Sequence, residues 1–98
     1  MVITIKCPIS EVVLRKGHIY MLVHEDRPEE ALYVGSTSAR YERFMNHLSQ
    51  MRHGKGPLHR WAKEQNCVSS IKMVILADVE FYTLRQLQAQ EFKFQEKL

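Results

Sequence analysis

The sequence predicts an α+β fold in which a small three-stranded antiparallel sheet is flanked by helices. Two strand-like segments on either side of a polar turn are typical of a β-hairpin, and amphipathic segments and an apolar run follow them. A chain of 98 residues suits one modest core. We therefore expect a single domain over residues 1–98, with residues 1–16 as an N-terminal extension packed on it, either as an extra strand or as an arm.

The hairpin is expected to place two tyrosines together. One strand covers residues 18–24, the polar residues 25–30 form the connecting turn, and residues 31–35 form the return strand. Side chains alternate between the two faces of a strand. Tyr20 and Tyr33 can therefore share one face of the sheet.

Three helices and one more strand are expected after the hairpin. Ser36, Thr37 or Ser38 can cap a helix that begins near residue 39, and residues 57–65 form a short second helix after a glycine–proline break. Residues 71–77 are an apolar strand suited to the centre of the sheet. A last amphipathic helix covers residues 81–97.

The positive charge of the chain is local. Between positions 40 and 63, six basic residues face the single acid Glu42. They are Arg40, Arg43, Arg52, Lys55, Arg60 and Lys63. A local basic surface suits a polyanion, of which nucleic acid is the commonest, although charge alone fits an ordinary solvated helix pair equally well.

Cysteine and histidine patterns argue against a disulfide framework and a zinc site. Only Cys7 and Cys67 are present, and His47, His53 and His59 recur every six residues, which does not place them on one helix face. No apolar run approaches the roughly 20 residues of a membrane span, and no export signal is present at the N-terminus. We therefore expect an intracellular protein with no membrane partner.

Five residues are candidates for a functional site. Glu91 interrupts the apolar stripe of the last helix, and an unpaired buried carboxylate costs several kcal/mol, so we expect a cation or a metal beside it. Arg43 and His47 are four residues apart on one helix face. The other interpretation is that Tyr20 and Tyr33 are half-buried strand aromatics and that Arg43 and His47 are solvated.

The order of these motifs resembles the GIY-YIG nuclease family over residues 17–98. The chain has His18-Ile19-Tyr20, then Tyr33-Val34-Gly35, then Arg43 with His47, a glycine–proline break, an apolar strand and Glu91. The resemblance implies the α/β sandwich of that family. The first motif departs from the family because His18 stands where glycine is usual, with Gly17 before it.

The resemblance also implies roles for the five residues. Tyr20 corresponds to the tyrosine that activates water, with Tyr33 and His47 holding it, while Arg43 contacts the scissile phosphate. Glu91 corresponds to the carboxylate that binds one divalent metal, Mg²⁺ or Mn²⁺. For Tyr20 to act as a phenolate, a cation and a histidine must lower the phenol pKa from its ordinary value of about 10.

These observations predict a metal-dependent endonuclease that hydrolyses phosphodiester bonds in DNA, with RNA left open. Further nucleic-acid contacts are expected from Gly35, Ser36, Arg40, Arg52, His53, Lys55 and Arg60. Gly35 would let the chain turn close to the substrate backbone, and His53 falls near a basic position of some family members. A partner subunit or a homodimer is expected for double-strand cleavage.

Two other functions fit the same sequence. The first is a catalytically weak or inactive nucleic-acid-binding module of the same fold, in which the departure at His18 has cost turnover. The second is a small protein-interaction domain that uses the helices around Trp61.

Overall fold

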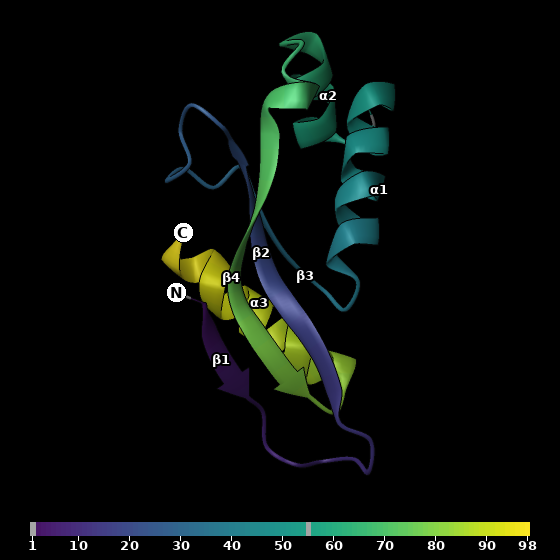
Figure 1. Ribbon diagram of the computed structural model, residues 1–98, viewed down its shortest axis with the longest axis vertical. Coiled ribbons are helices and arrows are strands. Elements are labelled where there is room, and N and C mark those ends of the chain that lie inside the picture. Colours follow the sequence, from purple (N-terminus) through teal and green to yellow (C-terminus); the bar gives the residue numbers. More distant parts are fainter. Residues whose placement is uncertain (1, 55) are drawn as a thin grey trace.

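A computed structural model describes residues 2–54 and 56–98 of the chain. The α+β fold with helices flanking a sheet is confirmed (Figure 1). The elements are β1 (Ile3–Lys6), β2 (Arg15–His24), β3 (Tyr33–Thr37), α1 (Arg40–His53), α2 (Pro57–Glu64), a 3-10 turn (Val68–Ser70), β4 (Ile71–Phe81) and α3 (Leu84–Lys97).

In this part of the chain four strands form one sheet, in the order β1-β4-β2-β3. The expected three antiparallel strands are β4, β2 and β3, but the sheet is mixed because β1 adds to β4 in parallel, with Ile3 opposite Ala77 and Lys6 opposite Glu80. Part of the expected N-terminal extension is therefore a strand of the sheet. β1 pairs the backbone groups along the outer edge of β4, which would otherwise lie open.

A β-bulge in β4 divides the interior into two cores. Ile19 lies opposite Ala77 but Tyr20 lies opposite Ile75, so Leu76 is an extra residue in β4. An extra residue exchanges the faces to which the following side chains point. Ile71 and the odd-numbered positions up to Ile75 consequently face one side of the sheet, whereas Ala77 and the odd-numbered positions after it face the other.

The helices cover these two faces separately. In Figure 1, α1 and α2 lie at the upper end of the sheet, and α3 crosses the other face lower down. The buried residues on the first side, here called the α1/α2 core, are Tyr20, Leu22, Met51, Ala62, Cys67 and Ile71. Those on the second side, the α3 core, are Cys7, Ile19, Val34, Ala77, Val79, Phe81 and Leu87.

The helix termini differ from expectation at two places. The first turn of α1 follows Ala39 without a side-chain cap, and Thr37 instead accepts a hydrogen bond from the Ala39 amide at 3.0 Å. α3 begins three residues later than expected because Phe81 still belongs to β4. Its start is a capping box in which Thr83 and Gln86 satisfy each other's backbone amides.

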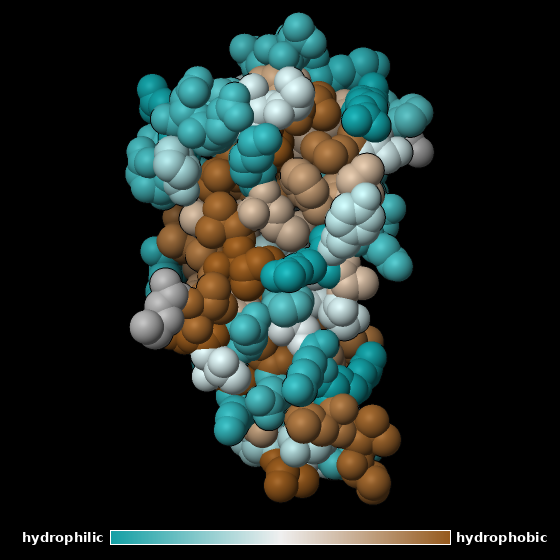
Figure 2. All heavy atoms as spheres, in the orientation of Figure 1, coloured by the Kyte–Doolittle hydropathy of each residue, from teal (hydrophilic) through white to brown (hydrophobic). Residues whose placement is uncertain are grey.

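The loop between β1 and β2 exposes apolar side chains. Figure 2 shows them gathered at the lower end of the molecule, and Val12 there is 99% exposed. Of residues 7–14, only Cys7 belongs to a core. None of the helices within the described residues is both long enough and apolar enough to cross a membrane.

Candidate functional site

A line of hydrogen-bonded side chains enters the α1/α2 core. The Tyr20 hydroxyl oxygen lies 2.8 Å from His47 Nε2, and both side chains are 0% exposed. Arg43 Nε donates to the same hydroxyl oxygen at 3.3 Å, and His47 Nδ1 lies 3.1 Å from Nε2 of His59. These four residues are called the polar chain below.

Local geometry explains how the polar chain forms. Arg43 and His47 are one helical turn apart, so the same face of α1 carries both toward the sheet. Tyr20 points to that face from β2, and α2 brings His59 from the other side of the glycine–proline break. Throughout the described residues, every buried side-chain nitrogen or oxygen has a hydrogen-bond partner, which avoids the cost of burying an unsatisfied polar group.

Tyr33 and Gly35 complete this side of the site. The Tyr33 ring lies edge-on to His47, with centroids 5.0 Å apart, and 6.1 Å from the Tyr20 ring, so the two tyrosines do share a face. A Cβ atom on Gly35 would lie 2.6 Å from the Tyr20 hydroxyl oxygen. Gly35 is buried within β3 rather than in a turn, and its visible role is to leave space for the two phenols.

Burial sets the protonation of the polar chain. It raises the pKa of Tyr20 to about 12, and the hydrogen bond from Arg43 only partly offsets this. Burial, with the nearby Arg43 charge and His59, lowers the pKa of His47 to about 4. The phenolate role requires that a cation and a histidine lower the phenol pKa, and this condition is not met in the free protein because desolvation of the phenolate outweighs the cation. Both groups are therefore neutral at pH 7.

Within the described residues, the hydrogen-bond partners of Glu91 are neutral side chains, and the metal ion expected as the other alternative stays a prediction. The half-buried Glu91 carboxylate accepts a hydrogen bond from the Ser36 hydroxyl at 2.6 Å and one from Gln95 Nε2 at 3.1 Å. The same amide nitrogen also donates to the carbonyl of Val34. Hydroxyl and amide donors suffice because the carboxylate is only partly removed from water.

Glu91 and the polar chain lie on opposite faces of the edge strand. Gly35 adjoins Tyr20 on the α1/α2 side, whereas the next residue, Ser36, points to Glu91 on α3. The structure thus brings four of the five candidate residues together and places the fifth across β3.

The carboxylate is compatible with one hard metal ion. The described residues contain no group of three or more histidine, cysteine, aspartate or glutamate side chains that could hold a metal. Mg²⁺, however, is often bound through one or two carboxylates together with water and substrate phosphate. The half-exposed Glu91 carboxylate, with the Ser36 hydroxyl beside it, fits that kind of site.

The remaining basic candidates lie apart from the polar chain. Arg40, Arg52 and Arg60 are exposed on α1 and α2, and Lys55 lies outside the described residues. His53 Nδ1 donates to the Ser49 carbonyl of its own helix at 2.8 Å. The histidine that does join the site is His59, which the sequence analysis missed. The only signal was the break between the two helices, which lets residues on different helices face each other.

The residues of the first motif are also engaged. His18 Nδ1 lies 2.8 Å from an Asp78 carboxylate oxygen on the neighbouring strand β4. Gly17, which precedes it, is buried, and a Cβ atom there would lie 2.9 Å from the Thr37 carbonyl oxygen. The Tyr20 backbone, two residues after His18, pairs regularly with Gly35 of β3.

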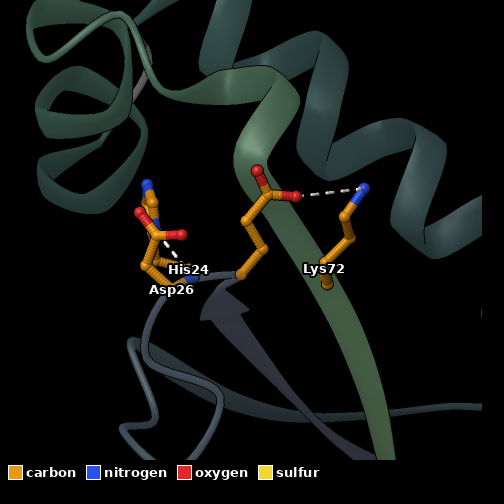
Figure 3. Close-up of polar contacts among 4 residues, drawn as sticks. His24, Asp26 and Lys72 are labelled. Carbon is orange, nitrogen blue, oxygen red and sulfur yellow. Dashed lines mark hydrogen bonds and ion pairs between the residues drawn. The ribbon is translucent and has the colours of Figure 1, made fainter.

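A separate cavity of about 350 Å³ lies at the other end of the hairpin. It is lined by His24, Asp26, Arg27, Glu30, Leu32 and Trp61. Figure 3 shows His24 beside Asp26 at the end of β2. Lys72 Nζ of β4 lies 3.9 Å from a carboxylate oxygen of Glu25. The Lys72–Glu25 contact links the loop after β2 to β4, and no member of the polar chain lines this cavity.

Comparison of the chain with models of known protein families, with curated proteins and with solved structures found no match.

Proposed function

We propose that this protein is a metal-dependent endonuclease that hydrolyses phosphodiester bonds in DNA. The observation that carries the proposal is the hydrogen bond from Arg43 to Tyr20, whose hydroxyl also contacts the neutral His47. A guanidinium, a phenol and a proton-accepting imidazole in one contact can supply the phosphate binding and the proton transfer that assist phosphodiester hydrolysis. The resemblance of the motifs to GIY-YIG nucleases supports the same reaction.

Arg43 is the phosphate-binding group of this proposal. Its half-buried guanidinium is a cation at neutral pH because the ordinary pKa of arginine lies far above 7. Burial lowers this pKa, and contact with the Tyr20 and Tyr33 phenols more than offsets that effect. Guanidinium suits phosphate because it offers paired donors in a plane. In the free protein Arg43 Nε donates to a lone pair of the Tyr20 hydroxyl oxygen. When Arg43 binds a phosphate instead, this hydrogen bond breaks. That lone pair then becomes available to the attacking water.

Tyr20 acts as a relay in this proposal rather than as a standing phenolate. With a pKa of about 12, the phenol stays protonated at neutral pH. As the Tyr20 oxygen takes a proton from the attacking water, its own proton passes to His47 Nε2, so that one O–H bond forms as another breaks. The half-buried Tyr33 ring holds the His47 imidazole by edge-on contact.

Glu91 would hold Mg²⁺ or Mn²⁺ at the free edge of β3, where the bound ion supplies charge neutralisation for the phosphate. Arg40, Arg52 and Arg60 would contact phosphates without reading sequence. A partner subunit or a second copy would be needed for a double-strand break.

The second candidate function is a nucleic-acid-binding module without turnover. The observation that favours it is the complete burial of Tyr20, which keeps water from the phenol in the free protein. Cleavage of plasmid DNA with Mg²⁺ and with EDTA decides between the two. Nicking or linearisation that requires Mg²⁺ supports the nuclease, whereas a gel shift in EDTA without cleavage in Mg²⁺ supports the binding module.

A further inference from the structure

The hydrogen bonds of the polar chain have a direction. Arg43 can only donate, so the Tyr20 oxygen accepts from Arg43 Nε. The hydrogen of the Tyr20 hydroxyl then goes to its nearest acceptor, His47 Nε2 at 2.8 Å. An imidazole that accepts at Nε2 and is neutral carries its own hydrogen on Nδ1. That hydrogen points to Nε2 of His59 at 3.1 Å.

We propose that His59 is a positioning residue for His47. By accepting the Nδ1 hydrogen, His59 holds His47 in the tautomer that leaves Nε2 open to the Tyr20 proton. The two rings are stacked, with centroids 5.3 Å apart and planes inclined by 29°, so His59 also fixes the plane of the imidazole. The tautomer is inferred from these contacts and from the neutral state of His47, while its effect on cleavage rests on the proposed nuclease function.

Burial makes this arrangement matter. His47 is 0% exposed, so water does not offer an alternative acceptor for its Nδ1 hydrogen. Without an acceptor at position 59, the other tautomer would place its hydrogen on Nε2, facing Tyr20. Tyr20 would then receive two donors, and its own hydrogen would have no imidazole to go to. Tyr20 could then not pass its proton to His47.

Two variants distinguish a role of His59 as a hydrogen-bond acceptor from a role in packing alone. His59→Gln keeps a side-chain oxygen that can accept from His47 Nδ1, whereas His59→Leu fills similar space and has no acceptor. His24→Leu is the matched control, because His24 lies at the far end of β2 and contacts Asp26 instead of the polar chain. Long-range proton–nitrogen NMR spectra at pH 7 report the tautomer of each histidine directly.

The wild-type protein and His59→Gln are expected to show His47 with its hydrogen on Nδ1. His59→Leu is expected to move it to Nε2, and to lower single-turnover DNA cleavage by ~10²-fold with unchanged DNA binding, as for loss of a proton acceptor. His59→Gln should recover most of that rate, and His24→Leu should change neither measurement.

The proposal is overturned if wild-type His47 carries its hydrogen on Nε2, or if a folded His59→Leu keeps the wild-type tautomer. Should His59→Leu not fold, the wild-type and His59→Gln spectra still decide. A wild-type protein that cleaves no DNA would remove the proposed nuclease function, while the NMR result would still decide the role of His59.

Discussion

The two faces of the sheet have different interiors. On the α1/α2 side a phenol and an imidazole are buried in contact with a guanidinium. On the α3 side the interior is apolar, and the carboxylate of Glu91 stays at its margin, against the Ser36 hydroxyl. Buried polar groups contribute little net stability even when fully paired, whereas buried apolar area is the dominant stabilising term. Both faces therefore bury apolar side chains, and among the described residues only the α1/α2 face also buries an imidazole.

The largest expected effect tests the margin of the α3 face. Glu91→Gln should abolish Mg²⁺-dependent cleavage, because the neutral amide removes the charged carboxylate through which Mg²⁺ would be bound. The melting temperature should hardly change, because the Gln oxygen can still accept from Ser36. Plasmid cleavage across a Mg²⁺ titration measures the first effect. Glu96→Gln, an exposed acid on the same helix, is the control, and cleavage at equal rates by both variants would exclude Glu91 as a metal ligand.

A second variant tests whether the α3 core serves stability without chemistry. Phe81→Ala should lower the free energy of unfolding by ~3–5 kcal/mol, the usual cost of truncating a buried aromatic; Phe81 is fully buried. Below the melting temperature, the cleavage rate per folded molecule should remain near that of the wild type. Urea denaturation with cleavage at low temperature measures both. A variant that stays folded but loses cleavage would mean that the two faces are not separable.

The buried His47 of the polar chain should make the folded protein less stable in acid. His47 has a pKa of about 4 in the folded protein and an ordinary value of 6.5, so between these values the unfolded chain binds more protons. The free energy of unfolding is therefore unaffected by this group above pH 6.5. It decreases by roughly 3 kcal/mol as the pH falls toward 4. Urea denaturation from pH 7 to pH 4 should show this loss. His47→Gln cannot titrate there, and an equally steep loss in that variant would assign the acid sensitivity elsewhere.

The smallest expected effects separate chemistry from general electrostatics. Arg43→Ala should slow cleavage by ~10²-fold, as for one lost donor to transition-state charge. Arg52→Ala, an exposed arginine of the same helix, should instead weaken binding and reduce its salt dependence by about one charge. Cleavage rates and binding at several salt concentrations distinguish them. If both variants behave alike, Arg43 is only part of the basic surface.

Features set by local spacing could be predicted from the sequence. The hairpin, the shared face of Tyr20 and Tyr33, and the approach of Arg43 and His47 to it depend on strand alternation and on one helical turn. Even so, β3 begins two residues later than expected, because residues 31 and 32 still belong to the loop. Boundaries depend on pairing that the period of the pattern does not encode.

Features set by pairing between distant segments could not be predicted. The parallel pairing of β1 depends on the open edge of β4. The bulge at Leu76 divides the apolar side chains of β4 between the two faces of the sheet. His59 reaches His47 only through the packing of α2 on α1. Glu91 lies in the apolar stripe of α3 by sequence spacing. In the structure its carboxylate instead lies at the edge of the sheet, where it accepts a hydrogen bond from Ser36.

The most direct test of the proposed proton relay through Tyr20 is the single-turnover cleavage of a DNA duplex by the wild type and Tyr20→Phe at saturating Mg²⁺. Removal of the hydroxyl leaves the ring to pack and should cost only about 1 kcal/mol of stability. Tyr41→Phe, at an exposed position of α1, is the control. If Tyr20 relays the proton of the attacking water, Tyr20→Phe should be slower by ~10²–10⁴-fold with unchanged DNA affinity. Equal rates for Tyr20→Phe and the wild type would contradict this account and return Tyr20 to the core as a packing residue.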